Sequence, residues 1–263
     1  MIIFLLILLG LVWGSFVNAF IWRFHEGKDW LWDRSECQYC HHQLAVRDLV
    51  PVVSWLLLRG RCRYCYHHID DSPLVEIVMP LLFLASYAWW PLPLNGAGLF
   101  QFILWLLFIV GFVALAAYDI RWYILPNKIV YPLIALAALQ LLVLVFWYGA
   151  GWTTILAGAA GVTIISGTFY VLFQISKGRW IGGGDVKLGI MLGLLSGGAE
   201  RALLLLFLAS LVGTIAMLPL MVRGRLKPKA VVPFGPFLLL ASVIVQLFGA
   251  HIISWYMGLS SVT

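Results

Sequence analysis

Long apolar segments, separated by short polar stretches, follow one another along almost the whole chain. A helix crosses the hydrocarbon core of a bilayer with about 20 apolar residues. By this measure the sequence predicts eight spans, at 1–22, 74–90, 99–118, 128–148, 152–175, 186–197, 201–222 and 232–256. The sixth segment is short and rich in glycine, which predicts a helix packed closely against its neighbours. The expected fold is therefore an all-α polytopic membrane protein with about eight transmembrane helices.

The same pattern divides the chain into three parts. We expect a first transmembrane helix at 1–22, a polar loop domain at 23–73 and a transmembrane core at 74–263. No basic residue precedes the first apolar run, whereas Arg23 follows it. A cleaved secretory signal has the opposite charge order. We therefore expect 1–22 to be retained as a helix whose N-terminus lies outside the cytosol.

Composition and charge support this topology. Of the 263 residues, 63% are apolar and 11% are charged, whereas a soluble domain has about 25% charged residues. With the N-terminus outside, 16 of the 17 Lys and Arg residues fall in the cytosolic segments 23–73, 119–128, 176–187 and 223–230. Positive charge in short loops marks the cytosolic face. The net charge of +6 is thus explained by a lipid bilayer, and we expect no nucleic-acid partner.

Three acidic residues, Glu76, Asp119 and Asp185, lie at or just inside the ends of predicted spans. A carboxylate in that position is costly unless it is paired or functional. Two predicted spans separate Asp119 from Asp185, and an even number of crossings returns the chain to the same membrane face. Two neighbouring carboxylates do not both ionise easily, so one keeps a proton and the other acts as a base. Such a pair can activate water for attack on a peptide carbonyl.

Each of these acids also has a structural interpretation. Asp119 could pair with Arg121 and Asp185 with Lys187, while Glu76 could be an acid that favours a helix N-terminus. Three glycines stand immediately before Asp185. They remove side chains there, which allows another backbone or an extended substrate to come close. Plain helix starts are also glycine-rich, so this feature is compatible with both interpretations.

Two C-x-Y-C motifs in the loop 23–73 contain all four cysteines of the chain, with 21 residues between the motifs. Paired CxxC motifs at such a spacing are typical of a four-thiolate zinc site, and disulfides are rare in the cytosol. A redox pair and a metal-free loop remain alternatives. A closed site of four thiolates is structural. The predicted zinc ligands are Cys37, Cys40, Cys62 and Cys65, in a small zinc-ribbon-like domain.

These motifs together resemble one family, the prepilin peptidases, which are membrane aspartyl proteases with a GxGD element. The resemblance covers almost the whole chain. It rests on GSFVN at 14–18, both cysteine pairs with DLVPVVSWL at 48–56 between them, PLVE at 73–76, YD at 118–119, LPN at 125–127, GGGDVKL at 182–188 and PFGPF at 233–237.

The resemblance implies that the chain cleaves the leader of type IV prepilins and type II secretion pseudoprepilins at the cytosolic face of the bacterial inner membrane. The two catalytic aspartates of the family fall on Asp119 and Asp185. Members that carry the four-cysteine loop also methylate the new N-terminus, so S-adenosyl-L-methionine is the second expected cofactor beside structural zinc. The expected supporting positions are Glu76, Pro126, Asn127, Gly182, Gly184 and Lys187.

Two other functional classes remain open. Intramembrane carboxylates are also typical of a proton-coupled transporter, although no inverted repeat of broken helices is evident. The other class is a zinc-organised assembly scaffold with structural carboxylates. Asp70-Asp71-Ser72 replaces the Ser-x-Arg-Tyr stretch that is common in the family. We expect Asp70 and Asp71 to attract the basic leader, with a solvated charge pair as the alternative.

Overall fold

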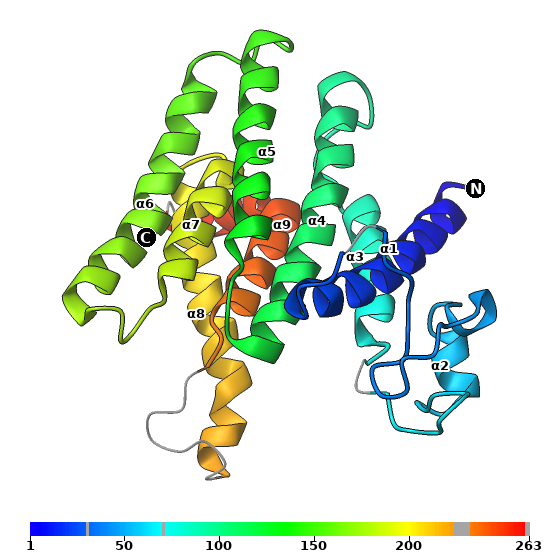
Figure 1. The fold of residues 1–263 in the computed structure, drawn as a ribbon. Helices are drawn as coiled ribbons and strands as arrows, with labels where there is room; N and C mark the ends of the chain where they lie inside the picture. The colour runs from blue at the N-terminus through cyan, green and yellow to red at the C-terminus, as the bar shows by residue number, and fades with distance from the viewer. Residues whose placement is uncertain (30–31, 70–71, 224–231, 261–263) are drawn as a thin grey trace. The chain divides into compact units, whose positions relative to one another are not determined.

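The computed structural model describes residues 1–29, 32–69, 72–223 and 232–260 (Figure 1). Asp70, Asp71 and most of the basic segment 223–230 lie outside the described residues, so the predictions that concern them stay predictions. All regular elements of the described part are helices, which confirms the expected all-α fold. In chain order they are α1 (Ile2–His25), η1 (Val46–Asp48), α2 (Val53–Leu57), α3 (Leu74–Ala88), α4 (Gly96–Trp122), α5 (Asn127–Phe146), α6 (Thr153–Ser176), α7 (Gly183–Ser196), α8 (Ala199–Val222) and α9 (Gly235–Ser260).

Six of the described helices are long and apolar enough to cross a membrane, namely α1, α4, α5, α6, α8 and α9. The other two predicted spans correspond to α3, with 15 residues, and α7, with 14. Both are shorter than the roughly 20 residues that a straight crossing needs. The multi-pass membrane character is therefore confirmed, while the count of eight spans stays a prediction.

The chain forms two compact units, and the first contains residues 1–88 with residues 106–117 of α4. Within it, glycines of α1 pack directly against α3. A Cβ atom at Gly14 would lie 2.7 Å from the Cα of Glu76, and one at Gly10 would overlap the backbone of Pro80. Small residues allow such close approach between membrane helices. This contact holds the start of α3 beside the C-terminal half of α1.

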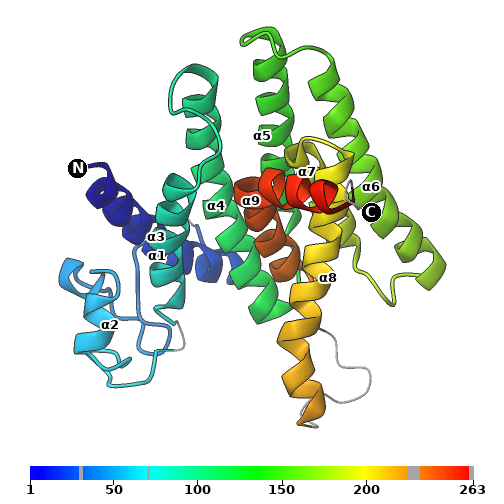
Figure 2. The same ribbon diagram turned by 180° about the vertical axis from the view of Figure 1, so that it is seen from behind.

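The second unit contains residues 89–105 and 118–263, and α7 lies among its other helices with each of its residues buried or half-buried. It contacts α5, α6, α8 and α9 (Figures 1 and 2). A Cβ at Gly189 would lie 3.0 Å from the Cα of Ser166, and one at Gly193 would overlap the backbone of Val162. The Ser166 hydroxyl donates to the carbonyl of Val186 at 2.9 Å. The predicted close packing of the glycine-rich segment is thus confirmed, and it fixes where α7 begins.

Candidate functional site

Asp119 occupies the last turn of α4, at the end of that helix where the chain turns toward α5. Tyr123 ends the helix in the left-handed conformation, and its N–H donates to the carbonyl of Asp119 at 2.8 Å. The chain then reaches Pro126, which immediately precedes α5. The Asp119 side chain is buried. A buried carboxylate needs polar partners, because loss of its hydration is otherwise uncompensated.

Asp185 is the third residue of α7, directly after the glycine run. Gly182 is the N-cap in an extended conformation, and its carbonyl accepts from the Asp185 N–H at 3.1 Å. The Gly182 N–H in turn faces the Asp185 carboxylate. The side chain of Asp185, at the third helical position, thus makes one half of a capping box, while Gly182 has no side chain to make the other half. This contact holds the carboxylate at the positive end of the helix dipole.

The start of α9 and the loop before α5 bring the two aspartates into one site. The Gly235 N–H donates to the Asp119 carboxylate, and a Cβ at Gly235 would lie 2.6 Å from Asp119 Oδ2. Leu125 packs against both glycine positions, because a Cβ at Gly184 would lie 3.0 Å from its Cβ and one at Gly235 would lie 3.5 Å from its Cδ2. The two carboxylates interact electrostatically.

The nearby bases do not neutralise these carboxylates. Lys187 donates from Nζ to Asn127 Oδ1 at 2.9 Å, which ties α7 to the start of α5. Its ammonium also lies 5.6 Å from the ring centre of Tyr131. Among the described residues, the ion pairs involve other acids than Asp119 and Asp185. The structural alternative of an Asp185–Lys187 pair therefore has no support in this geometry.

Two of the predicted supporting residues, Gly182 and Gly184, directly precede Asp185 at the start of α7. Pro126 and Asn127 stand at the start of α5, which Lys187 of α7 contacts through Asn127. Glu76 belongs to the first unit. Sequence reasoning missed Leu125 and Gly235 as parts of the site. The sequence does contain a signal for Gly235, because this glycine lies between Pro233 and Pro236 at the start of a predicted span. In the structure, the Asp119 carboxylate occupies the space that a side chain at this position would need.

The second candidate centre is the Cys loop, residues 26–73, in the first unit. Its two motifs have the same backbone geometry. The Cys37 N–H donates to the His42 carbonyl at 3.0 Å, and the Cys62 N–H donates to the His67 carbonyl at 2.8 Å. The ring of Tyr39 packs on His67, 3.5 Å between centres, and the ring of Tyr64 packs on His42 at 3.7 Å. The two motifs therefore have equivalent backbone structures, and the tyrosine ring of each packs on a histidine ring of the other.

The four thiols have the arrangement of a metal site. The sulfur atoms of Cys37, Cys40, Cys62 and Cys65 all lie within 4.8 Å of one another, and those of Cys37 and Cys65 are 3.8 Å apart. In a tetrahedron with Zn–S bonds of about 2.3 Å, the sulfur atoms are about 3.8 Å apart. The residues therefore fit a structural zinc ion.

Charged contacts hold the rest of the Cys loop in place. Asp48 accepts from Arg63 Nε at 2.7 Å and from the Tyr64 hydroxyl at 3.0 Å. Burial favours the neutral form of Asp48, but these hydrogen bonds outweigh it and lower its pKa. The hydrogen bond from Lys28 likewise lowers the pKa of Glu36, against the effect of burial. Hydrogen bonds from Arg63 and Tyr64 to Asp48 thus hold the segment between the two motifs against the second motif, in addition to the cluster of thiols.

We expect one tightly bound zinc ion per chain, because four thiolates complete a tetrahedron and leave no open position. Elemental analysis of gently purified protein would measure it. A metal content near zero, together with four thiols that react with a titrating reagent, would contradict the assignment. Replacement of the exposed Tyr66 by Phe is a suitable control, since this residue follows the second motif and contributes no sulfur ligand.

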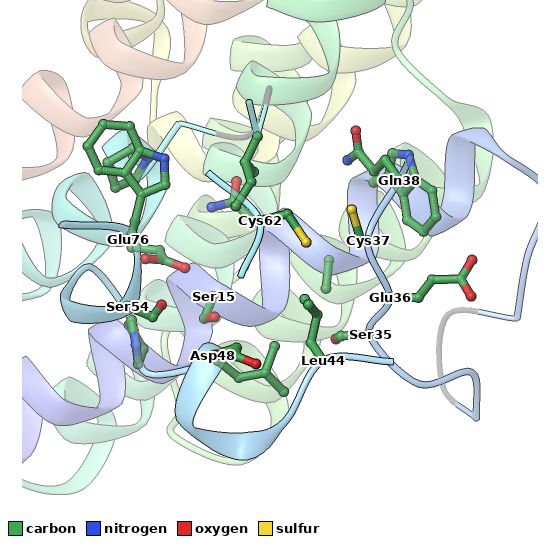
Figure 3. Close-up of a pocket in the computed structure, with 18 of the residues that line it drawn as sticks. Ser15, Ser35, Glu36, Cys37, Gln38, Leu44, Asp48, Ser54, Cys62 and Glu76 are labelled. Atoms are coloured by element: carbon green, nitrogen blue, oxygen red, sulfur yellow. The ribbon is translucent and has the colours of Figure 1, made fainter. Parts of the chain in front are cut away.

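A cavity of about 450 Å³ lies between α1, the Cys loop and the start of α3, entirely within the first unit. Figure 3 shows Glu76 and Ser54 at one end of the cavity and Glu36 and Gln38 at the other. Cys37 and Cys62 contribute to its wall. The sequence motifs had not indicated a cavity, because its lining comes from segments up to about 60 residues apart along the chain.

Comparison with known proteins finds similarity along most of the chain. Residues 8–90 match the model of the bacterial peptidase A24 N-terminal domain, and residues 105–218 match that of the type IV leader peptidase family. The chain is 33% identical to a prepilin leader peptidase/N-methyltransferase of Dickeya chrysanthemi, over 89% of this chain and 88% of the relative. It is 29% identical to the protein of that name from Bacillus subtilis, over 97% and 98%. No solved structure matches the chain.

The two matched regions follow the order of the centres described above. The N-terminal match contains the Cys loop and its cavity, and the second match contains Asp119 and Asp185. A protein of Pseudomonas putida with the same name is 31% identical over 93% of this chain and 90% of its own length. The chain therefore belongs to the type IV leader peptidase family.

Proposed function

We propose that the chain cleaves the leader peptide of type IV prepilins and type II secretion pseudoprepilins with Asp119 and Asp185, and that it methylates the new N-terminal residue. The observation that carries the peptidase assignment is the pair of interacting carboxylates between α4, α7 and α9, with glycines next to both. The names of the relatives, prepilin leader peptidase/N-methyltransferase, support both activities.

The proposed mechanism needs one proton shared between the two carboxylates. The ionised carboxylate takes a proton from a water molecule while the water oxygen attacks the scissile carbonyl carbon. The protonated carboxyl donates its proton to the carbonyl oxygen, which gives a tetrahedral diol. The C–N bond then breaks as the carboxyl that took the water proton gives a proton to the leaving amine, and one diol hydroxyl returns its proton to the other carboxylate as the new carboxyl group forms. Atoms and charge balance without a further reactant.

The surroundings of the aspartates suit this chemistry. The Gly235 N–H and the Gly182 N–H each orient one carboxylate. The absence of a Cβ at Gly184 and Gly235 allows Leu125 and the Asp119 carboxylate to lie directly against the backbone at these positions. The Lys187–Asn127 hydrogen bond fixes the start of α7 against the start of α5. These residues position the reacting groups rather than exchange protons with the substrate.

The distribution of Lys and Arg supports a cytosolic location for both centres in the bacterial inner membrane. Asp119 and Asp185 lie in predicted cytosolic segments that share 16 of the 17 basic residues with the Cys loop and the 223–230 segment. A substrate with a basic leader would meet this face first, before its apolar helix enters the bilayer.

The cavity beside the Cys loop fits the methyl donor S-adenosylmethionine. It has the volume for a ligand of that class, apolar walls from Phe16, Trp22 and Trp55, and a buried acceptor oxygen on Asn18 without a hydrogen-bond partner. When bound, the donor supplies an electrophilic methyl group on a positively charged sulfur. The chain would contribute the walls that exclude water, while zinc at the four thiols would hold the wall residues Cys37 and Cys62 in place.

The alternative functions receive less support. Asp119 and Asp185 lie in the last turn of α4 and the first turn of α7, whereas a transporter binds its ions near the middle of broken helices. A scaffold would require carboxylates in structural ion pairs, and the ion pairs of the described residues involve Lys28, His41 and Arg63 with other acids.

Incubation of the purified protein with a prepilin, followed by mass spectrometry of the product, tests the proposal directly. Loss of the leader alone would support the peptidase, and a further gain of one methyl group in the presence of S-adenosylmethionine would support the transferase. An intact prepilin after incubation with fully folded protein would contradict the peptidase assignment.

Gly235→Ala should slow cleavage without removing either carboxylate. The new methyl group would lie 2.6 Å from Asp119 Oδ2, so the carboxylate or α9 must move. Misplacement by about 1 Å can cost on the order of 100-fold in rate. Gly167→Ala is the matched control, since a Cβ there meets nothing within 4 Å. Equal cleavage rates for the two variants would contradict the role of Gly235.

A further inference from the structure

The short helix α2 presents an apolar face to the outside of the Cys loop. Val53, Leu56 and Leu57 are spaced by three and four residues, so their side chains lie on one face of the helix, here called the α2 face. They are 50%, 60% and 76% exposed. The side chains of Trp55 and Leu58 instead line the cavity. The inner side of α2 is therefore used by the fold, while the α2 face points away from it.

Further exposed apolar side chains precede the α2 face. Val46 is 85% exposed and Val50 is 43% exposed. Five large apolar residues of the one short segment 46–57 are thus exposed outside the membrane-spanning helices. An exposed apolar patch of this kind marks a surface that contacts a protein or a membrane. The position of the Cys loop and its charge decide between these two partners.

The Cys loop lies against the C-terminal half of α1, a helix that is long and apolar enough to cross a membrane. The cavity between them is lined by α1 residues from Val12 to Arg23, which is about 16 Å of helix at 1.5 Å per residue. Within this stretch, Asn18 donates to the carbonyl of Ser72 at the end of the loop. A membrane core is only about 30 Å thick, so a loop that covers this part of α1 reaches the level of lipid.

Positive charge accompanies the apolar patch. The segment 46–61 contains three arginines with exposed side chains, Arg47, Arg59 and Arg61. Its single acid, Asp48, is already paired with Arg63. Among the described residues, none of the three arginines has a side-chain hydrogen bond or an ion pair. The segment therefore has an excess of positive charge, which is complementary to anionic lipid headgroups.

We propose that the α2 face and these three arginines form an interfacial anchor that holds the Cys loop on the membrane surface. The partner is the bilayer itself: the α2 face inserts at the boundary of headgroups and acyl chains, and the arginines contact anionic phospholipids. The loop is joined to α1 at one end and to α3 at the other, so lipid is present at high effective concentration. Because Trp55 and Leu58 lie on the opposite side of α2, the anchor also fixes one wall of the cavity relative to the bilayer.

The test is lipid photolabelling of the full-length, zinc-loaded protein in nanodiscs that hold one chain each. All discs contain the same mixture of phosphatidylcholine and phosphatidylglycerol. The photoreactive acyl chain is carried by the first lipid in one set of discs and by the second lipid in the other set. Peptide mass spectrometry locates the adducts, with the membrane helix α5 as the internal reference. Residues 53–57 should be labelled at a yield comparable to that of α5, with a preference for phosphatidylglycerol.

Two variants separate the apolar contact from the charged contact. Leu57→Gln should lower the labelling of α2 several-fold relative to α5, because an amide side chain does not favour the acyl boundary. Combined replacement Arg59→Gln and Arg61→Gln should reduce the preference for phosphatidylglycerol about fivefold for each arginine near the anionic surface. Tyr66→Gln is the control, because Tyr66 is 74% exposed in the Cys loop but lies outside the segment 46–61. Zinc content and thermal unfolding show whether each variant is folded.

Labelling of residues 53–57 no stronger than that of the residues around Tyr66 would overturn the proposal, since the α2 face would then meet water or another protein. Unchanged labelling in folded Leu57→Gln would overturn it as well. Equal labelling of the wild-type protein by the two lipids would contradict the contact with anionic headgroups. The wild-type result stands even where a variant does not fold. Neither cleavage nor methyl transfer is measured, so the proposed enzymatic activities are tested independently.

Discussion

Replacement of either Asp119 or Asp185 by Asn is expected to reduce the rate of leader cleavage on the order of 1000-fold, the range for loss of a general acid or base. Two carboxylates that interact directly need each other, because one must hold the proton that the other lacks. The amide of Asn keeps the shape and one acceptor oxygen. The side chain in Asp119→Asn can therefore still accept from the Gly235 N–H, and the side chain in Asp185→Asn can still face the Gly182 N–H. The folded structure should persist.

The measurement is single-turnover cleavage of a prepilin by each variant in the same detergent. Asp33→Asn is the matched control, because Asp33 is exposed in the Cys loop, where it accepts the Asp29 N–H at 2.9 Å. It makes the same chemical change outside the site. Thermal unfolding of all variants separates loss of chemistry from loss of structure. If Asp119→Asn or Asp185→Asn retains most of the wild-type rate in folded protein, the dyad assignment is wrong.

Replacement of Cys37 by Ser is expected to remove zinc and to impair methyl transfer far more than cleavage. The Cys37 sulfur is a member of the four-thiol cluster, and the residue also lines the cavity of the first unit. Asp119 and Asp185 belong to the second unit and are positioned by Leu125 and Gly235 of that same unit. Loss of a residue that only supports a metal ligand already lowers affinity or activity about 10- to 100-fold, so loss of a ligand should have at least that effect. Methyl transfer should fall by at least that amount.

The two activities are measured with two substrates. An intact prepilin reports cleavage, and a mature unmethylated pilin with labelled S-adenosylmethionine reports methyl transfer. In the reciprocal variant, Asp185→Asn, cleavage should stop while methylation of the mature pilin continues. Removal of zinc from the wild-type protein by a mild chelator should reproduce the Cys37→Ser pattern. Equal losses of both activities in Cys37→Ser, at normal protein levels, would show that the loop also serves proteolysis.

The sequence was sufficient for features that repeat or that depend on composition. Apolar run lengths predicted a multi-pass helical protein, since hydrocarbon thickness sets the length of a crossing helix. The paired C-x-Y-C motifs predicted a cluster of four thiols, because each motif folds locally around its own two cysteines. The glycine-rich segment predicted tight packing, which the approach of Gly189 to Ser166 confirms. The resemblance to prepilin peptidases is confirmed by the family match.

Side-chain partners over long sequence separations could not be predicted in this way. Lys187 stands two residues after Asp185 and could have paired with it, yet it bonds to Asn127, 60 residues away. Local spacing reports which residues share a helix face, but it does not report which neighbouring helix supplies the nearest acceptor. That choice depends on how α5 and α7 pack, and hence on side-chain volumes along both helices.

The sequence alone therefore determined the membrane class, the family and the two candidate centres, because these depend on periodicity, composition and short motifs. Tertiary structure alone decided how each centre is completed. It placed Leu125 between Gly184 and Gly235, and it joined Glu76 of α3 to Val52 of the Cys loop. The physical reason is that hydrogen bonds and close contacts act over about 3–4 Å in space. Only the folded chain brings residues this far apart in sequence within that distance.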